Sequence, residues 1–176
     1  MQNNIKYRVL MSDDINLYRE IRLDCLQNYP QNFGISFENE RETIKLKFDD
    51  ILKNKKSTSF LYGAFLEEKI IGICGFIRET SLKSKHRGKI SQMYVKDEFA
   101  GQKIGAQLLH LTLKKAFDDT TLELIELGVI KENQKAMDLY LKFGFVAFGQ
   151  FEKYFKFKEN YSTMIFMVLA KSDFLN

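Results

Sequence analysis

The chain has 176 residues, of which 45% are hydrophobic and 28% are charged, and its formal net charge is +4. This length and balance predict one folded domain over residues 1–176 and exclude an intrinsically disordered chain. The positive charge is mild and spread along the sequence, so we expect no nucleic-acid partner. With only two cysteines and two histidines, no metal-ligand spacing exists, and we expect no metal site. Cys25 and Cys74 lie in apolar runs and read as reduced core residues.

The first ten residues, MQNNIKYRVL, contain no apolar stretch typical of a signal peptide. The longest apolar run, near Met164–Ala170, is too short to span a bilayer. We therefore expect a cytoplasmic protein with no membrane partner, and either a monomer or a homodimer.

The first half of the sequence predicts a strand, two helices and a hairpin. In chain order these are Tyr7–Leu10, a helix that starts at Ser12–Asp14 and ends near Asn28, a helix over about Glu38–Lys53, and Ser59–Leu66 with Ile70–Glu79. The second helix is expected to bury Ile44, Phe48, Ile51 and Leu52 on its apolar face.

The second half alternates strands and helices and ends in an antiparallel pair. The expected elements are Lys89–Val95, Gly105–Asp118, Leu122–Val129, Asn133–Phe143, and Phe145–Lys153 with Ser162–Leu169. The whole order predicts an α+β fold with a mixed, mostly antiparallel central sheet. Aromatic residues alternate with lysines around Gln150–Tyr161, which favours an amphipathic hairpin that buries alternate rings; an aromatic lining for a ligand is the other interpretation.

A glycine-containing loop joins the strand that ends at Val95 to the helix that begins near Gly105. Its sequence over residues 96–106 is KDEFAGQKIGA. A helix N-terminus carries unpaired N–H groups and the positive end of the helix dipole, so such a loop can bind a phosphate through its backbone. Two glycines before a helix are also typical of an ordinary turn.

A second pattern lies on the following helix, where residues 133–145 read NQKAMDLYLKFGF. Asn133 is a good N-cap, and Ala136 and Tyr140 are four residues apart on one helix face. The small Ala136 leaves room for a ligand along that face, toward which Tyr140 would point its hydroxyl. Tyr140 also has a plain interpretation as a core tyrosine whose hydroxyl reaches the surface.

The order of these two segments resembles the GCN5-related N-acetyltransferase (GNAT) family, and in particular its small bacterial members. The family signature Arg/Gln-x-x-Gly-x-Gly/Ala falls on residues 100–105, where Ala100 and Lys103 depart from it. The family run Asn-x-x-Ala-x-x-x-Tyr-x-x-x-Gly-Phe falls on residues 133–145 without a gap. Lys103 would be strained if its position needs a positive φ, or it could place an ammonium beside a diphosphate.

The resemblance implies a sheet of about seven strands with about four helices, and acetyl-CoA bound where two parallel strands splay apart. It assigns the cofactor to the strand end, the glycine loop and the following helix, that is, to Met93, Tyr94, Val95, Gly101, Gln102, Lys103, Ile104, Gly105, Ala106, Asn133, Ala136 and Tyr140. The acceptor pocket would come from Phe33–Glu40 and Gln150–Tyr161, with Phe33, Glu38 and Glu40 as candidate substrate residues.

The implied reaction is direct attack of an amine on the thioester of acetyl-CoA. Tyr140 is the predicted general acid for the leaving thiolate, and the backbone N–H of Met93 or Tyr94 is the expected donor to the oxyanion. The general base stays open among Glu38, Glu40, a water chain and an amine that arrives neutral. Two alternatives also remain: a module that binds acyl-CoA without turnover, and an interaction domain that does not bind CoA.

Overall fold

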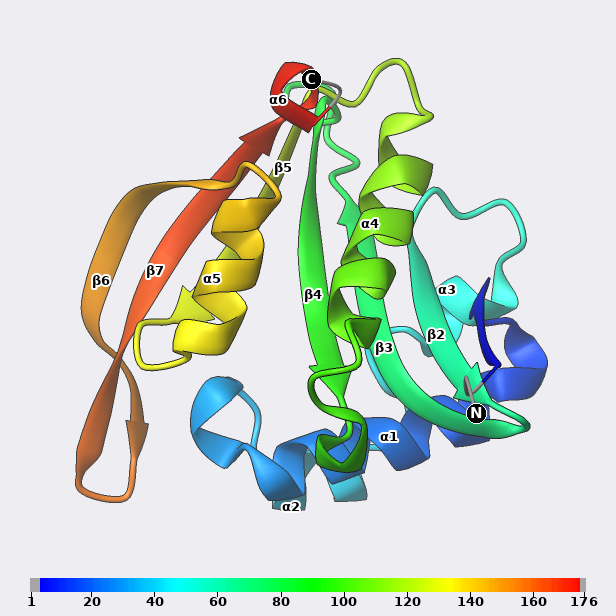
Figure 1. Cartoon of the computed structure of the whole chain (residues 1–176), viewed down its shortest axis with the longest axis vertical. Helices are drawn as coiled ribbons and strands as arrows, with labels where there is room; N and C mark the ends of the chain where they lie inside the picture. The colour runs from blue at the N-terminus through cyan, green and yellow to red at the C-terminus, as the bar shows by residue number, and fades with distance from the viewer. Residues whose placement is uncertain (1–3, 175–176) are drawn as a thin grey trace.

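A computed structural model describes residues 4–174, and it contains one seven-stranded mixed sheet (Figure 1). The strands lie in the order β1-β2-β3-β4-β5-β7-β6, and all neighbours pair antiparallel except β4 and β5. Their bounds are β1 Ile5–Val9, β2 Phe60–Leu66, β3 Lys69–Arg78, β4 Arg87–Val95, β5 Leu124–Ile130, β6 Val146–Phe157 and β7 Asn160–Ala170. The predicted mixed, mostly antiparallel sheet with one parallel pair is therefore confirmed.

Helices cover both faces of the sheet. The α-helices are α1 Ile15–Asn28, α2 Phe37–Glu42, α3 Asp49–Lys53, α4 Ile104–Phe117, α5 Gln134–Lys142 and α6 Lys171–Phe174. Three short 3₁₀ turns precede or connect them, namely η1 Ser12–Asp14, η2 Pro30–Asn32 and η3 Asp97–Phe99. Within the described residues, no helix combines the length and the apolar character needed to cross a membrane.

Two hydrophobic clusters lie on opposite faces of the sheet. On one face, α4 and α5 contribute buried side chains such as Leu108, Leu113 and Tyr140. On the other face, Tyr18 and Ile21 of α1 pack with apolar residues of β2 and β3. Because each helix buries only one stripe, the rigid sheet fixes the positions of α1, α4 and α5 relative to β4 and β5.

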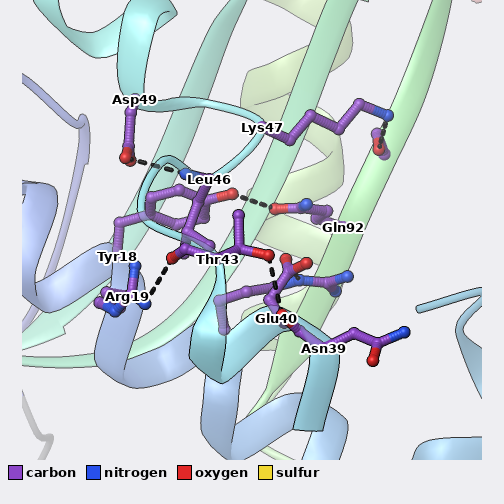
Figure 2. A network of polar contacts seen from close by, with 11 residues as sticks. Tyr18, Arg19, Asn39, Glu40, Thr43, Leu46, Lys47, Asp49 and Gln92 are labelled. Carbon is purple, nitrogen blue, oxygen red and sulfur yellow. Dashed lines mark hydrogen bonds and ion pairs between the residues drawn. The ribbon is translucent and has the colours of Figure 1, made fainter. Parts of the chain in front are cut away.

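The single helix expected over Glu38–Lys53 is wrong, because the chain forms α2 and α3 with an extended segment between them. Ile44, expected on the buried face, is 96% exposed, whereas Leu46 and Phe48 are buried. Thr43 leaves the helical conformation with ψ at 122°, and Arg19 of α1 donates to its carbonyl at 2.7 Å. The Asp49 carboxylate, at the start of α3, then accepts from the N–H of Leu46 at 2.9 Å (Figure 2). This local hydrogen bond, together with the burial of the alternate residues Leu46 and Phe48, breaks the continuous helix that the apolar periodicity predicted.

The favoured expectation that the last hairpin buries alternate aromatics is also wrong. Phe151, Tyr154, Phe157 and Tyr161 are between 38% and 59% exposed. β6 is an edge strand that pairs only with β7, and the register shifts between Phe151 and Phe155, so its aromatic residues do not share one buried face. The hairpin end extends beyond α5 (Figure 1).

Candidate active site

The strands β4 and β5 pair over only a short distance and then separate. Their parallel register covers Arg87–Lys89 against Leu124–Glu126, although β3 stays paired with β4 as far as Val95 and β7 stays paired with β5 as far as Ile130. In Figure 1 the two strands diverge from the end near the C-terminus, and α5 lies beside the opening. The inner edges of β4 and β5 therefore keep backbone groups that no neighbouring strand satisfies.

A cavity of about 410 Å³ occupies this opening, and residues from both faces of the sheet line it. The strand residues are Ile90, Ser91, Gln92, Met93, Tyr94 and Val95 of β4 and Leu127, Gly128, Val129 and Ile130 of β5. On the α5 side the lining is Ala100, Asn133, Lys135, Ala136, Leu139 and Tyr140, and on the α1 side it is Tyr29, Asn32, Phe33 and Asp97. The cavity thus connects the two faces through the gap in the sheet.

A β-bulge distorts β4 at the wall of this cavity. The register passes from Ser91 opposite Gly75 to Tyr94 opposite Ile73, so Gln92 and Met93 share one partner position, and Gln92 has φ 55°. The buried Tyr18 hydroxyl donates to Gln92 Oε1 at 2.8 Å and fixes that side chain toward α1 (Figure 2). Burial raises the pKa of Tyr18 to about 12, so this donor keeps its proton over the physiological range.

The glycine loop connects the end of β4 to the N-terminus of α4, whose first N–H groups have no acceptor within the helix. Gly101 has φ +80° and Lys103 has φ 61°, and α4 begins directly after Lys103 at Ile104. The N–H groups of the first helical turn have no intrahelical acceptors, which leaves them available to an anion. The left-handed conformation of Lys103 explains why glycine suits this position, and it makes this lysine a strained residue.

Helix α5 presents a small residue and a tyrosine to the cavity. Asn133 caps the helix, because its side chain accepts from the N–H of Ala136 at 3.3 Å. Gly144 follows the end of α5 with φ +87°, a left-handed conformation that glycine adopts without strain. The Tyr140 hydroxyl lies on the cavity wall and has Met93 Sδ, a weak acceptor, at 3.6 Å. Burial raises the pKa of Tyr140 above its ordinary value, so the phenol stays protonated.

The structure brings seven of the fifteen predicted site residues together in one cavity. Met93, Tyr94, Val95, Asn133, Ala136, Tyr140 and Phe33 all line the cavity. The predicted loop residues Gly101, Gln102, Lys103, Ile104, Gly105 and Ala106 are not part of the lining; they follow Ala100, which is, and lead into α4. A Cβ added to Gly105 would stand 3.4 Å from Met93 Cε, which places this glycine directly against β4.

The two candidate glutamates lie outside this cavity. Glu40 is buried and forms an ion pair with Arg22, whose Nε donates to Glu40 Oε1 at 2.9 Å. Glu38 lines a second cavity, between the η2 region and β6. This buried ion pair, which lies outside the cavity, gives Glu40 a structural role.

Several cavity residues were not predicted from the sequence. Tyr29 donates to Asp97, which raises the pKa of Tyr29 to about 12. The predicted residue Tyr94 donates to Asp24 at 2.7 Å, a contact that was not predicted. These bonds tie η2 and α1 to β4 and η3 on the α1 side. Asn32 of η2, Gly128 of β5 and Lys135 of α5 also line the cavity, and none of them occupies a defined position of the sequence patterns described above.

Neither cysteine has the environment of a nucleophile. Cys25 and Cys74 are both buried, and burial raises the pKa of each thiol to about 12. A thiol with such a pKa carries almost no thiolate at neutral pH. The expectation that the cysteines are reduced core residues agrees with this geometry.

The chain matches the model of the acetyltransferase (GNAT) family over residues 17–145. It is 23% identical over 167 residues to spermidine N(1)-acetyltransferase from Vibrio cholerae, which covers 89% of this chain and 96% of that protein. Among solved structures, a GNAT-family acetyltransferase from Streptococcus pneumoniae superimposes with a TM-score of 0.82 at 22% identity, covering 95% of this chain and 99% of that one.

A structure of the spermidine N-acetyltransferase from Vibrio cholerae in complex with CoA and spermine gives a TM-score of 0.74 at 20% identity, over 98% of both chains. At these identities the structural likeness shows the fold, whereas the family match spans most of the chain and includes both sequence patterns. The separated β4 and β5, the glycine loop and α5 are thus the parts of an acyltransferase fold, and the chain belongs to the GNAT acetyltransferase family.

Proposed function

We propose that the protein transfers the acetyl group of acetyl-CoA to a primary amine. The observation that carries this proposal is the buried Tyr140, which lines a cavity between separated parallel strands and whose hydroxyl has, among the described residues, only a thioether acceptor. The relative from Vibrio cholerae binds CoA and spermine, which supports a CoA site and an amine acceptor in the same fold.

The residues present fit acetyl-CoA on three counts. The free edge of β4 at Met93, Tyr94 and Val95 offers backbone groups to the amides of the pantetheine arm. The free N–H groups at the start of α4 suit its diphosphate. The small side chain of Ala136 leaves space beside α5, so the pantetheine arm has room between the strands.

The chemistry requires an acid, an oxyanion donor and a neutral amine. Tyr140 keeps its proton at neutral pH and gives it to the leaving thiolate as the carbon–sulfur bond breaks. The backbone N–H of Met93 or Tyr94, next to the bulge, stabilises the oxyanion of the tetrahedral intermediate. The amine nitrogen attacks directly, and we propose that it loses its proton to water, because Glu40 is held by Arg22.

The experiment measures thiol release from acetyl-CoA in the presence of a mixed set of primary amines, with mass spectrometry of the products. The proposal predicts release of CoA that depends on the amine and an acetylated amine in equal amount. If acetyl-CoA binds but no thiol appears with any amine, the protein is a binding module, the alternative that Ala100 and the strained Lys103 favour.

A further inference from the structure

A second cavity of about 650 Å³ adjoins the first on the α1 side of the sheet. It lies between the end of α1, the segment from Pro30 to Asn39, and residues 154–157 of β6. Phe33 lines both cavities, so the second begins where the first reaches this face. Phe33 is therefore the residue shared by the second cavity and the cavity that Gln92 and Met93 line.

Five of the fifteen residues that line the second cavity are aromatic. These rings are Phe33, Phe37, Tyr154, Phe155 and Phe157. Tyr154 and Phe155 meet edge to face at 4.7 Å, and a Cβ added to Gly34 would stand 2.7 Å from Phe155 Cζ, so the loop packs directly on β6. Tyr154 is 38% and Phe157 is 39% exposed, which leaves ring surface that a ligand can cover.

The charges around the two cavities balance. Asp97 and Lys135 line the first cavity, and Glu38 and Lys156 line the second. Asp97 already accepts from Tyr29, and the Arg22 guanidinium lies 5.1 Å from the centre of the Phe33 ring. A polyamine carries several ammonium groups that need carboxylate partners, and this lining supplies no excess of them.

We infer that the acceptor is a monoamine carried on an aromatic body, with its ring against Phe33, Tyr154 and Phe157 and its nitrogen directed at Gln92 and Met93. This inference rests on the proposed amine acetylation and names its substrate class. An aromatic ring buried among aromatic side chains gains contact area and edge-to-face geometry, each such pair being worth about 0.5–1.5 kcal/mol beyond its area.

The test compares initial rates of CoA release at saturating acetyl-CoA for 2-phenylethylamine, propylamine, spermidine and a short peptide with an N-terminal alanine. We expect kcat/KM for 2-phenylethylamine to exceed each of the others by about tenfold or more, which corresponds to one or two favourable ring contacts. A higher kcat/KM for spermidine or for the peptide would overturn the inference and leave the proposed function intact.

Two variants of β6 separate the cavity from the rest of the strand. Phe157→Ala removes a lining ring and is expected to lower kcat/KM for 2-phenylethylamine about three- to tenfold while leaving propylamine unchanged. Phe148→Ala is the matched control, since Phe148 is 60% exposed on the same strand and lies outside the lining. Equal losses in both variants, or no loss in Phe157→Ala, would contradict the aromatic site.

A separate measurement distinguishes failure of the inference from failure of the proposed function. The melting temperature of each variant is recorded with and without acetyl-CoA, which reports cofactor binding independently of any acceptor. If acetyl-CoA raises the melting temperature but no amine releases CoA, both the proposed function and the inferred acceptor class are overturned.

Discussion

The two sides of the cavity between β4 and β5 differ in the groups that form them. On the α4 and α5 side, the important features are backbone N–H groups and small residues such as Gly105 and Ala136. On the α1 side, large side chains such as Tyr29 and Phe33 form the wall, and they come from a connection between helices. A backbone site requires small residues at fixed spacing, whereas a side-chain site can be rebuilt for another ligand without changing the fold.

The largest expected effect tests whether side-chain contacts on the α1 side stabilise the fold. Glu40→Gln removes one partner of a buried ion pair and leaves the Arg22 charge without compensation. The free energy of unfolding should fall by about 3–5 kcal/mol, measured by urea denaturation.

Glu38→Gln is the matched control for Glu40, since Glu38 is an exposed residue of the same helix, α2. Its unfolding free energy should stay within about 0.5 kcal/mol of the wild type. If Glu40→Gln kept full stability but lost most of its kcat, Glu40 would be the general base and its structural role would be refuted.

The next prediction locates the chemistry on the α5 side. Tyr140→Phe should lower kcat about a hundredfold or more with little change in KM for acetyl-CoA, because it removes the general acid and retains the ring. Stability should change little, since within residues 4–174 the acceptor for this hydroxyl is the weak one Met93 Sδ.

Tyr94→Phe is the comparison for Tyr140, because it removes a hydroxyl that lines the same cavity but donates to Asp24. It should keep kcat within a few-fold of the wild type. The raised pKa of Tyr140 means that its acid form persists as the pH rises, so its deprotonation should not limit kcat below about pH 10. Equal losses of kcat in the two variants would remove Tyr140 from the mechanism.

The smallest expected effect concerns the glycine loop. Lys103→Gly should raise the free energy of unfolding by about 1 kcal/mol, because glycine adopts φ 61° without the strain of a side chain. Lys103→Ala keeps the strain and removes the ammonium, so it separates the two interpretations of this residue. A loss of acetyl-CoA affinity in both variants, measured by calorimetry, would show that the ammonium contacts the diphosphate; unchanged affinity would show that backbone groups suffice.

The comparison also explains what the sequence could predict. The α4 and α5 side was found through the family resemblance, because glycine, alanine, asparagine and tyrosine stand at the spacing of the family motifs. The strained position of Lys103 followed from the same pattern and is seen in its φ of 61°. The mixed central sheet followed from the order of the elements, and the parallel pair was implied by the family resemblance.

The α1 side could not be predicted in the same way. The break between α2 and α3 depends on contacts of Arg19 with the carbonyls of Arg41 and Thr43, which lie more than twenty residues along the chain. The contact of Tyr29 with Asp97 and the ion pair of Arg22 with Glu40 likewise join distant segments. Such tertiary contacts override local helical periodicity and have no local signature.

The most direct test of the acetyl-CoA site is the melting temperature of the wild type and of Gly105→Trp with and without acetyl-CoA. Gly149→Trp serves as the control, because a Cβ at Gly149 meets no atom within 4 Å, whereas one at Gly105 meets Met93. We predict that acetyl-CoA at a hundredfold excess over its Kd raises the free energy of unfolding of the wild type and of Gly149→Trp by about 2.7 kcal/mol, which appears as a higher melting temperature. Gly105→Trp should remain folded and should show no rise in melting temperature with acetyl-CoA. An equal gain in Gly105→Trp would place acetyl-CoA elsewhere, and no gain in the wild type freed of bound CoA would contradict a cofactor site between β4 and β5.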